Sequence, residues 1–307
     1  MDEYVIRTEN LTKEYQGRIA VDRINLHVPK GKIYALLGRN GAGKTTTMKM
    51  LLNLVRPSGG SLFLFGEDCS RVSKKNGHRI GSVIETPAFY ENLTAKENLE
   101  ILARLRGRHR RDTIEYALSS MNLDKEGRKL FREYSLGMKQ RLGLAAAVMH
   151  EPELLVLDEP MNGLDPVGIY ETRKYFLQLC REKGTTIFIS SHVLNEIEQL
   201  ADVIGVMNNG KLLEETTIQE LYGSRRRYAE FTVSDVNKAA LVLERTFGIS
   251  DYVIAGSSRL RLYENIDSRA DINGAFVKEG ISVADIRVEA GKLEDYFTDL
   301  VGGAGNG

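Results

Sequence analysis

The chain has 307 residues, of which 42% are hydrophobic and 27% are charged. These values are ordinary for globular proteins and suit about two domains, and they exclude a disordered or low-complexity chain. Lysine plus arginine and aspartate plus glutamate both number 42, so no overall charge attracts the chain to nucleic acid, and no nucleic-acid partner is expected.

Two kinds of strand are predicted in the first two thirds of the chain. Near the amino terminus, residues 4–9, 20–28 and 61–65 read as strands of a small antiparallel sheet, with the clearest alternation of apolar and polar residues in 20–28. Later runs are short and continuously apolar, as in parallel strands that are buried on both faces. These runs are Ile33–Leu37, Leu154–Leu157, Thr186–Ser190 and Val203–Met207. Segments with helical spacing separate them, which predicts an α/β fold with a mostly parallel sheet.

A helical insertion is predicted within this α/β core, over about residues 88–150, because apolar residues repeat there on helical faces. From about Tyr228 the pattern changes to the order βαββαβ, a ferredoxin-like arrangement, with a last helix near Leu293 to Leu300. The expected domains are therefore residues 1–222 and an accessory α+β domain over 223–300. The glycine-rich residues 301–307 are expected to form a flexible tail.

The sequence gives no indication of a membrane span, a signal peptide, a disulfide or a zinc site. No run approaches the roughly 18 apolar residues that a membrane span needs, and the acidic start, Met1-Asp2-Glu3, is unlike a signal peptide. Cys69 and Cys180 lie far apart without zinc-ligand spacing, so both are expected to be reduced. A cytoplasmic location is the expectation.

A glycine-rich motif follows the first continuously apolar run. The segment Gly38-Arg39-Asn40-Gly41-Ala42-Gly43-Lys44-Thr45-Thr46 fits the pattern G-x-x-x-x-G-K-[ST] between a predicted strand and a predicted helix. Glycines let the backbone curl so that its N–H groups point at phosphate, and the helix adds the positive end of its dipole. Lys44 would reach the β and γ phosphates, and Thr45 would offer its hydroxyl to Mg²⁺. A plain glycine-rich turn is the alternative, which the position between strand and helix disfavours.

Two carboxylates follow the apolar run over 154–157. Asp158 ends the predicted strand and is a candidate second ligand for Mg²⁺ beside the phosphate loop. Glu159 faces differently and is a candidate general base for the water that attacks the γ phosphate. An apolar run before Asp-Glu is often only the end of a strand, but together with the phosphate loop it predicts hydrolysis of a nucleoside triphosphate.

Further motifs carry a resemblance to a known family. Tyr134-Ser135-Leu136-Gly137-Met138-Lys139-Gln140-Arg141 resembles the signature motif of the ATP-binding subunits of ABC transporters. Asn162-Gly163-Leu164-Asp165 looks like their D-loop, His192 stands where their switch histidine stands, and Tyr15 stands where their adenine-stacking aromatic residue stands. The resemblance covers about residues 4–220, with the motifs in the order that the family has.

The resemblance implies an ATPase with a P-loop core that binds ATP and Mg²⁺ and forms a head-to-tail dimer. In such a dimer, Ser135 and Gly137 of one copy cap the ATP on the phosphate loop of the other, and His192 senses the γ phosphate. Structural alternatives stay open: Ser135 as a helix N-cap, His192 as a core histidine, and Tyr15 as a packing residue. The family also implies separately encoded transmembrane permease subunits, which would hold the chain at the inner face of the cell membrane.

Two departures from the family pattern narrow the subgroup. Leu136 replaces a glycine of the signature motif, and Glu85 stands at the position of the Q-loop glutamine. Both features are similar to the branch of ABC exporters that confers bacitracin resistance and lantibiotic immunity. We expect Glu85 to be a third ligand for Mg²⁺ and to couple the nucleotide to the membrane partner; the alternative is a solvated strand end.

Other readings of the same sequence remain. A nucleotide-gated clamp on nucleic acid or ribosomes is the rival function, although the chain has one ATPase unit and no sustained heptads between Lys44 and Ser135. The C-terminal domain is expected to be a docking or dimer-contact module, with ligand-binding regulation as the alternative. The arginines within 104–111 and 225–227 suit either a solvated face or anionic lipid head groups.

Overall fold

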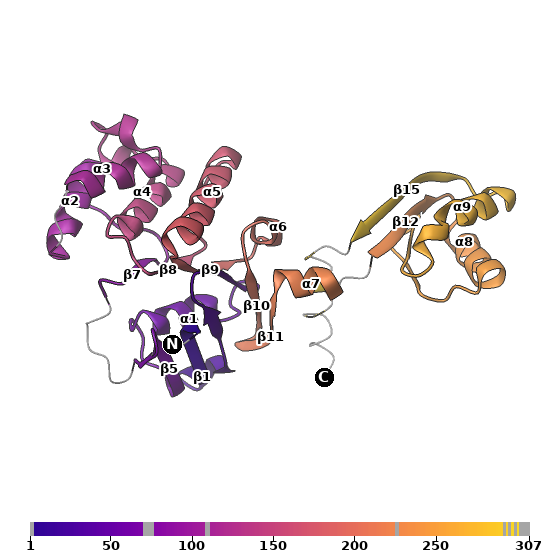
Figure 1. The fold of residues 1–307 in the computed structure, drawn as a ribbon, viewed down its shortest axis with the longest axis horizontal. Helices are drawn as coiled ribbons and strands as arrows, with labels where there is room; N and C mark the ends of the chain where they lie inside the picture. The colour runs from indigo at the N-terminus through magenta and orange to yellow at the C-terminus, as the bar shows by residue number, and fades with distance from the viewer. Residues whose placement is uncertain are drawn as a thin grey trace. The chain divides into compact units, whose positions relative to one another are not determined.

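The structure, a computed structural model, describes residues 3–69, 77–107, 111–224, 227–290, 293, 296–297 and 300. The chain divides into two compact units, Met1–Ile218 and Gln219–Gly307. The division that the sequence suggested at residue 222 falls within the helix α7, Ile218–Ser224. Figure 1 shows the elements of both units. Among the described residues, no helix has the length and apolar character that crossing a membrane requires.

A six-stranded sheet forms the centre of the first unit. Its order is β11-β10-β4-β9-β8-β7, and all neighbours are parallel except β10 and β11. The strands are β4 (Ile33–Leu37), β7 (Ile80–Val83), β8 (Leu154–Asp158), β9 (Thr186–Ser191), β10 (Val203–Asn208) and β11 (Lys211–Thr217). The helices of this part are α1 (Lys44–Leu51), α5 (Pro166–Lys183) and α6 (Leu194–Glu198). All side chains of β4, β8 and β9 are buried, which confirms that the continuously apolar runs are strands covered on both faces.

An antiparallel sheet shares its core with the parallel sheet. Its order is β2-β1-β5-β6, with β3 paired to β1. The strands are β1 (Tyr4–Tyr15), β2 (Arg18–Ile24), β3 (His27–Pro29), β5 (Gly59–Leu64) and β6 (Glu67–Asp68). Ile6 and Leu11 of β1 belong to the same buried cluster as Tyr34 and Phe188 of the parallel sheet.

The prediction of one strand over 20–28 was wrong, because the structure has two strands there. The Thr8 hydroxyl donates to the Ile24 carbonyl at 2.9 Å and accepts from the Leu26 N–H at 2.8 Å. This side chain therefore satisfies backbone groups between β2 and β3 that a continuous strand would have paired differently.

The predicted helical insertion is confirmed between β7 and β8. It contains α2 (Ala95–Leu105), α3 (Arg111–Ser120) and α4 (Leu136–Val148), with 3₁₀ turns over Asp124–Glu126 and Phe131–Glu133. Thr94 and Glu97 form a capping box at the start of α2, and the hydrogen bonds from Thr94 lower the pKa of Glu97. In Figure 1, α2, α3 and α4 lie together at one end of the first unit.

The second unit is an antiparallel sheet covered by two helices. Its strands, in the order β13-β14-β12-β15, are β12 (Arg227–Val233), β13 (Tyr252–Ile254), β14 (Arg259–Leu262) and β15 (Val283–Ala290). The helices are α8 (Val236–Val242), continued by a π-helical turn over Leu243–Phe247, and α9 (Arg269–Lys278), preceded by a 3₁₀ turn over Ile266–Ser268. Phe231 of β12 meets Phe276 of α9 edge to face, with the ring centroids 5.4 Å apart.

The chain order and strand order of this unit are ferredoxin-like, as the sequence predicted. The helix expected near Leu293 to Leu300 lies largely outside the described residues. The tail expected over 301–307 lies wholly outside them.

Candidate active site

The glycine-rich loop leaves the carboxyl end of β4 and enters α1. Gly41 and Gly43 have positive φ values of 82° and 109°, a left-handed conformation that side chains other than glycine rarely adopt. A Cβ atom on Gly43 would lie 2.7 Å from the Ala20 carbonyl oxygen, and one on Gly38 would lie 2.6 Å from that of Met207. Close backbone approach therefore requires glycine at positions 38 and 43, and the resulting curl is what the sequence predicted.

Lys44 begins α1 with only 6% of its surface exposed. Its amine donates a hydrogen bond to the Gly38 carbonyl at 2.7 Å and a longer one to the Arg39 carbonyl at 3.4 Å. The same amine lies 3.6 Å from Oε1 of Glu159. A buried ammonium group held by carbonyls of the loop is positioned to meet an anion in the curl.

Asp158 joins the phosphate loop to two strands of the parallel sheet. Its Oδ2 accepts a hydrogen bond from the Thr45 hydroxyl at 2.8 Å, and its Oδ1 accepts one from the Ser190 hydroxyl at 2.5 Å. Ser190 was predicted only as the last residue of a strand, without a role in the site. The register pairs Asp158 of β8 with Ser190 of β9, so the two strand ends meet at one edge of the sheet.

Glu159 has a left-handed backbone conformation and contacts other residues than Asp158 does. Its φ is 48°, and its N–H donates to the Ser190 hydroxyl at 2.9 Å. Its Oε2 lies 2.9 Å from Nδ1 of His192, so the carboxylate lies between this ring and the Lys44 amine. A non-glycine residue in this region costs on the order of 1–3 kcal/mol, and such strain concentrates at functional sites.

A cavity of about 610 Å³ opens around this group of residues. Its size lies within the range of small-molecule sites. Tyr15 is a lining residue with 44% of its surface exposed, and the amine of Lys13 lies 4.7 Å from its ring centroid. Lining residues that the sequence analysis predicted are Tyr15, Asn40, Gly41, Ala42, Gly43, Lys44, Thr45, Thr46, Asp158 and Glu159. Those that it missed are Arg18, Ile19, Ala20, Asn209 and Gly210, which carry no motif signal.

Glu85 is not among the residues that line this cavity. Its carboxylate is 63% exposed and lies 2.6 Å from the amine of Lys49, in the last turn of α1. The hydrogen bond that Lys49 donates to Glu85 raises the pKa of Lys49, and the negative charges of Glu85 and Asp158 add to the shift. Glu85 therefore approaches the site through a lysine, and the structure does not bring it to Thr45 and Asp158.

The residues of the signature motif and the D-loop also do not line the cavity. Ser135 is the N-cap of α4 and accepts a hydrogen bond from the Met138 N–H, and Asp165 is the N-cap of α5 and accepts one from the Gly168 N–H. A Cβ atom on Gly137 would lie 2.9 Å from the Gly163 carbonyl oxygen, so the two motifs pack against each other.

The protein is a P-loop ATPase by class. This follows from the phosphate loop between a strand and a helix, the Thr45–Asp158 pair and the adjacent Glu159. A family model described as ABC transporter matches residues 21–162. The bacitracin transport ATP-binding protein BcrA of Enterococcus faecalis is 55% identical over 307 residues, which cover 99% of this chain and 98% of that protein.

Two further comparisons agree with this match. The lantibiotic transport ATP-binding protein SrtF of Streptococcus pyogenes is 43% identical over 211 residues, which cover 69% of this chain and 90% of that protein. A solved structure of an ATP-binding subunit of an ABC transporter has a TM-score of 0.65 and 27% identity, covering 71% of this chain and 92% of that one. The chain therefore belongs to the family of ATP-binding subunits of ABC transporters and is an ATPase, as the motifs indicated.

Proposed function

We propose that Lys44, Glu159 and His192 carry out ATP hydrolysis at the carboxyl edge of the sheet and that this hydrolysis powers export of a peptide antibiotic. The observation that supports it most strongly is the connected set of hydrogen bonds from Thr45 through Asp158 and Ser190 to Glu159. One set of contacts thus links the phosphate loop to a candidate base.

Mg²⁺ fits the donors of this site. The Thr45 hydroxyl and the Asp158 carboxylate are hard oxygen ligands whose donor atoms lie 2.8 Å apart. Mg²⁺ is usually bound by one or two protein ligands together with substrate phosphates. Bound there, the ion would offset the charge of the phosphates. Glu85 would have to leave Lys49 to become a further ligand.

The side chains around the cavity have distinct roles in this proposal. Lys44 exchanges its loop carbonyls for phosphate oxygens when ATP binds. Glu159 accepts the proton of the attacking water, and His192, bonded to the Glu159 carboxylate, orients that carboxylate and reaches the γ phosphate. Tyr15 stacks on the adenine with the ring face that Lys13 leaves free.

A second copy of the chain completes the site. Ser135 and Gly137 lie at the start of α4, a helix of 13 residues whose N-terminus presents the positive end of its dipole. Because neither residue lines the cavity of its own chain, contact with ATP requires the signature motif of another copy. The head-to-tail dimer supplies that contact, with Asp165 near its interface.

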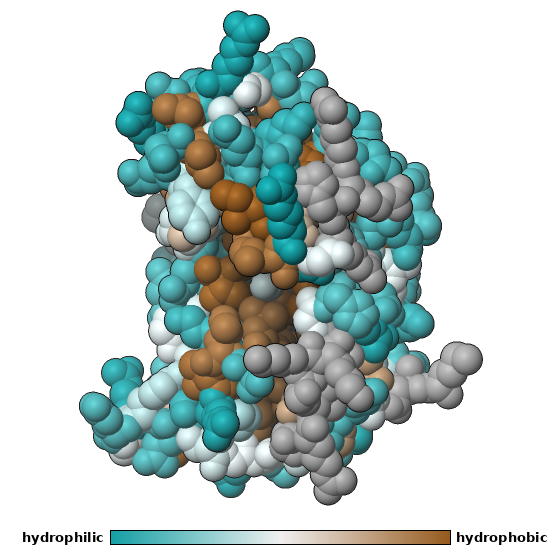
Figure 2. Space-filling view, turned by 90° about the vertical axis from the view of Figure 1, so that its left-hand side faces the viewer, coloured by the Kyte–Doolittle hydropathy of each residue, from teal (hydrophilic) through white to brown (hydrophobic). Residues whose placement is uncertain are grey.

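Separate membrane subunits would carry the cargo, as the relatives named as transport ATP-binding proteins suggest. The side of the first unit shown in Figure 2 is hollowed, and hydrophobic side chains gather there between hydrophilic margins. A concentrated apolar surface of this kind is typical of a protein interface, and we place the permease on it. The chain would then lie at the cytoplasmic face of the membrane. The relatives named for bacitracin and lantibiotic transport suggest a peptide antibiotic as cargo.

Co-purification tests this assembly. Tagged Glu159→Gln protein, isolated from detergent-solubilised host membranes with Mg²⁺ and ATP, should bring polytopic membrane proteins with it in stoichiometric amount. Recovery of only soluble protein or nucleic acid would contradict the permease partner and favour a clamp.

A resistance assay tests the cargo. Cells with the permease and the parent chain should survive higher bacitracin concentrations than cells with Lys44→Ala, whereas Lys174→Glu, an exposed change on α5, should match the parent. Equal sensitivity of all three strains would contradict bacitracin as cargo.

A further inference from the structure

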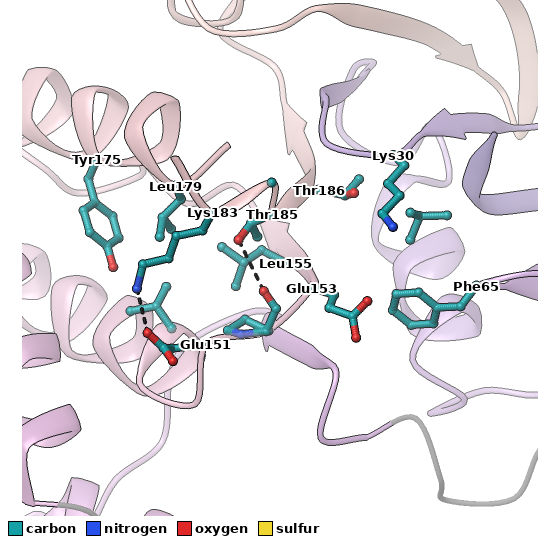
Figure 3. A pocket seen from close by; sticks show the side chains of 14 residues that line it. Lys30, Phe65, Glu151, Glu153, Leu155, Tyr175, Leu179, Lys183, Thr185 and Thr186 are labelled. Carbon is teal, nitrogen blue, oxygen red and sulfur yellow. Dashed lines mark hydrogen bonds and ion pairs between the residues drawn. The ribbon is translucent and has the colours of Figure 1, made fainter. Parts of the chain in front are cut away.

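A second cavity, of about 570 Å³, lies at the opposite, amino-terminal edge of the six-stranded sheet (Figure 3). Leu155 near the start of β8 and Thr186 at the start of β9 contribute to it, as do the last turns of α4 and α5. None of the residues proposed to act on ATP lines it. Its volume falls in the range of small-molecule sites, about 300–1,000 Å³.

The interior of this cavity is apolar. Leu155 is fully buried, and Leu179 and Val148 are at most 6% exposed. Phe65 closes one side, where the Arg79 guanidinium lies 3.7 Å from its ring centroid. Figure 3 shows Tyr175 on the other side. An apolar body with a polar group at its edge matches these walls.

Two ion pairs form at the rim of the cavity, and Lys30 is a further cation there. Lys183 lies 2.8 Å from Glu151, and Arg79 holds Glu153 through two hydrogen bonds of 2.6 and 2.9 Å. The Lys30 amine has no hydrogen bond or ion pair within the described part of the chain, and Figure 3 shows it turned toward the cavity.

Two lysines and two glutamates line the rim, and Arg79 adds a positive charge beside Glu153. The bond from Arg79 lowers the pKa of Glu153, with smaller contributions from Lys30 and His78, so this carboxylate already faces more than one cation. The carboxyl end of α5 has a negative dipole, but Arg181 and Lys183 in its last turn offset it.

We propose that this cavity is a binding site for an amphiphile with an apolar, ring-sized body and one anionic group. The body lies against Leu155 and Leu179, and the anion pairs with Lys30. The site is separate from the nucleotide cavity and does not depend on the function proposed above.

The probe for the test is 8-anilinonaphthalene-1-sulfonate, whose fluorescence rises in apolar surroundings. It should bind the parent protein with ADP present in excess, and Lys30→Glu should weaken binding about tenfold, the loss expected for one charge-assisted contact. Lys174→Glu makes the same change of charge at an exposed position of α5 outside the cavity, and it should leave the affinity unchanged. The neutral analogue N-phenyl-1-naphthylamine should bind the parent more weakly and should not distinguish Lys30→Glu from it.

A second variant tests the body of the site. Leu179→Trp fills the cavity and should abolish probe binding, while circular dichroism and ADP affinity confirm that the variant is folded. Equal affinity of the parent and Lys30→Glu would overturn the proposal. Displacement of the sulfonate by ADP, or undiminished binding to folded Leu179→Trp, would also overturn it.

Discussion

The same parallel strands have two ends with different chemistry. At the carboxyl edge, polar side chains from different segments bond to one another, since Thr45 and Ser190 both donate to Asp158, and Ser190 also accepts from the Glu159 N–H. At the amino edge, charged side chains form separate pairs around an apolar floor, as Arg79 does with Glu153.

The direction of the helices explains part of this difference. α1 begins at the carboxyl edge, so its unpaired N–H groups and positive dipole end face the cavity there. α4 and α5 end at the amino edge, where such donors are absent and lysine side chains supply the positive charge instead. A connected network therefore responds to the loss of any member, whereas the loss of a separate pair leaves its neighbours unchanged.

The largest effect should follow from Glu159→Gln. Removing the base should lower the rate of ATP hydrolysis by about 10²–10⁴-fold, while ATP binding persists because Lys44 and the loop are intact. Steady-state hydrolysis and equilibrium binding of labelled ATP measure the two effects, and the variant should accumulate as an ATP-bound dimer in sedimentation. Glu182→Gln, at an exposed position of α5, is the control and should hydrolyse ATP like the parent. Normal turnover of Glu159→Gln would remove Glu159 as the base.

An intermediate effect should follow from Ser190→Ala. The change removes the donor to Asp158 and the acceptor of the Glu159 N–H, so we expect hydrolysis to fall about tenfold, equivalent to roughly 1.4 kcal/mol. Ser82→Ala, at an exposed position of β7, makes the same chemical change and should have no effect. If both variants turned over at the parent rate, the carboxyl-edge network would have no catalytic importance.

The smallest effect should follow from Glu153→Gln at the amino edge. Because Arg79 lowers the pKa of Glu153 in the folded state, the carboxylate contributes stability above its unfolded pKa and loses that contribution as the pH falls through the folded pKa. At pH 7 we expect the free energy of unfolding to fall by less than about 1 kcal/mol, since the side chain is half exposed.

Urea unfolding of the parent and of Glu153→Gln over a series of pH values measures this difference in the free energy of unfolding. ATP hydrolysis should be the same in both proteins. The difference should narrow as the pH drops below about 4, the usual range of a glutamate. Glu91→Gln, an exposed side chain for which no pair is seen among the described residues, is the control. A difference that widened in acid would contradict the pairing.

The buried strands could be predicted because short, continuously apolar runs are typical of parallel strands that are covered on both faces. β7 was missed, since Ile80-Gly81-Ser82-Val83 has only two apolar residues at its ends. A Cβ atom on Gly81 would lie 2.1 Å from the Ala147 carbonyl oxygen, so close contact with α4 requires glycine within this strand. A sequence pattern shows which residues are hydrophobic, but it does not show where the backbones of a strand and a helix come this close.

The site was predictable where a motif is continuous in sequence, as in the phosphate loop and Asp158-Glu159. Ser190 could have been found from its position at the end of a strand, because ends of parallel strands meet at one edge. The partner of Glu85 could not have been found from the sequence, because the 2.6 Å contact with Lys49 joins side chains 36 positions apart. The roles of Ser135 and Glu85 stay predictions.

Mixing two inactive variants tests the central claim, that one active site is built from two copies. Lys44→Ala removes the phosphate-loop amine, and Ser135→Arg blocks the exposed start of α4. In a head-to-tail dimer of one copy of each, one site combines the intact Lys44 with the intact Ser135. We predict that each variant alone fails to hydrolyse ATP and that the mixture regains hydrolysis. A mixture as inactive as its components, or full activity of Ser135→Arg alone, would contradict the account.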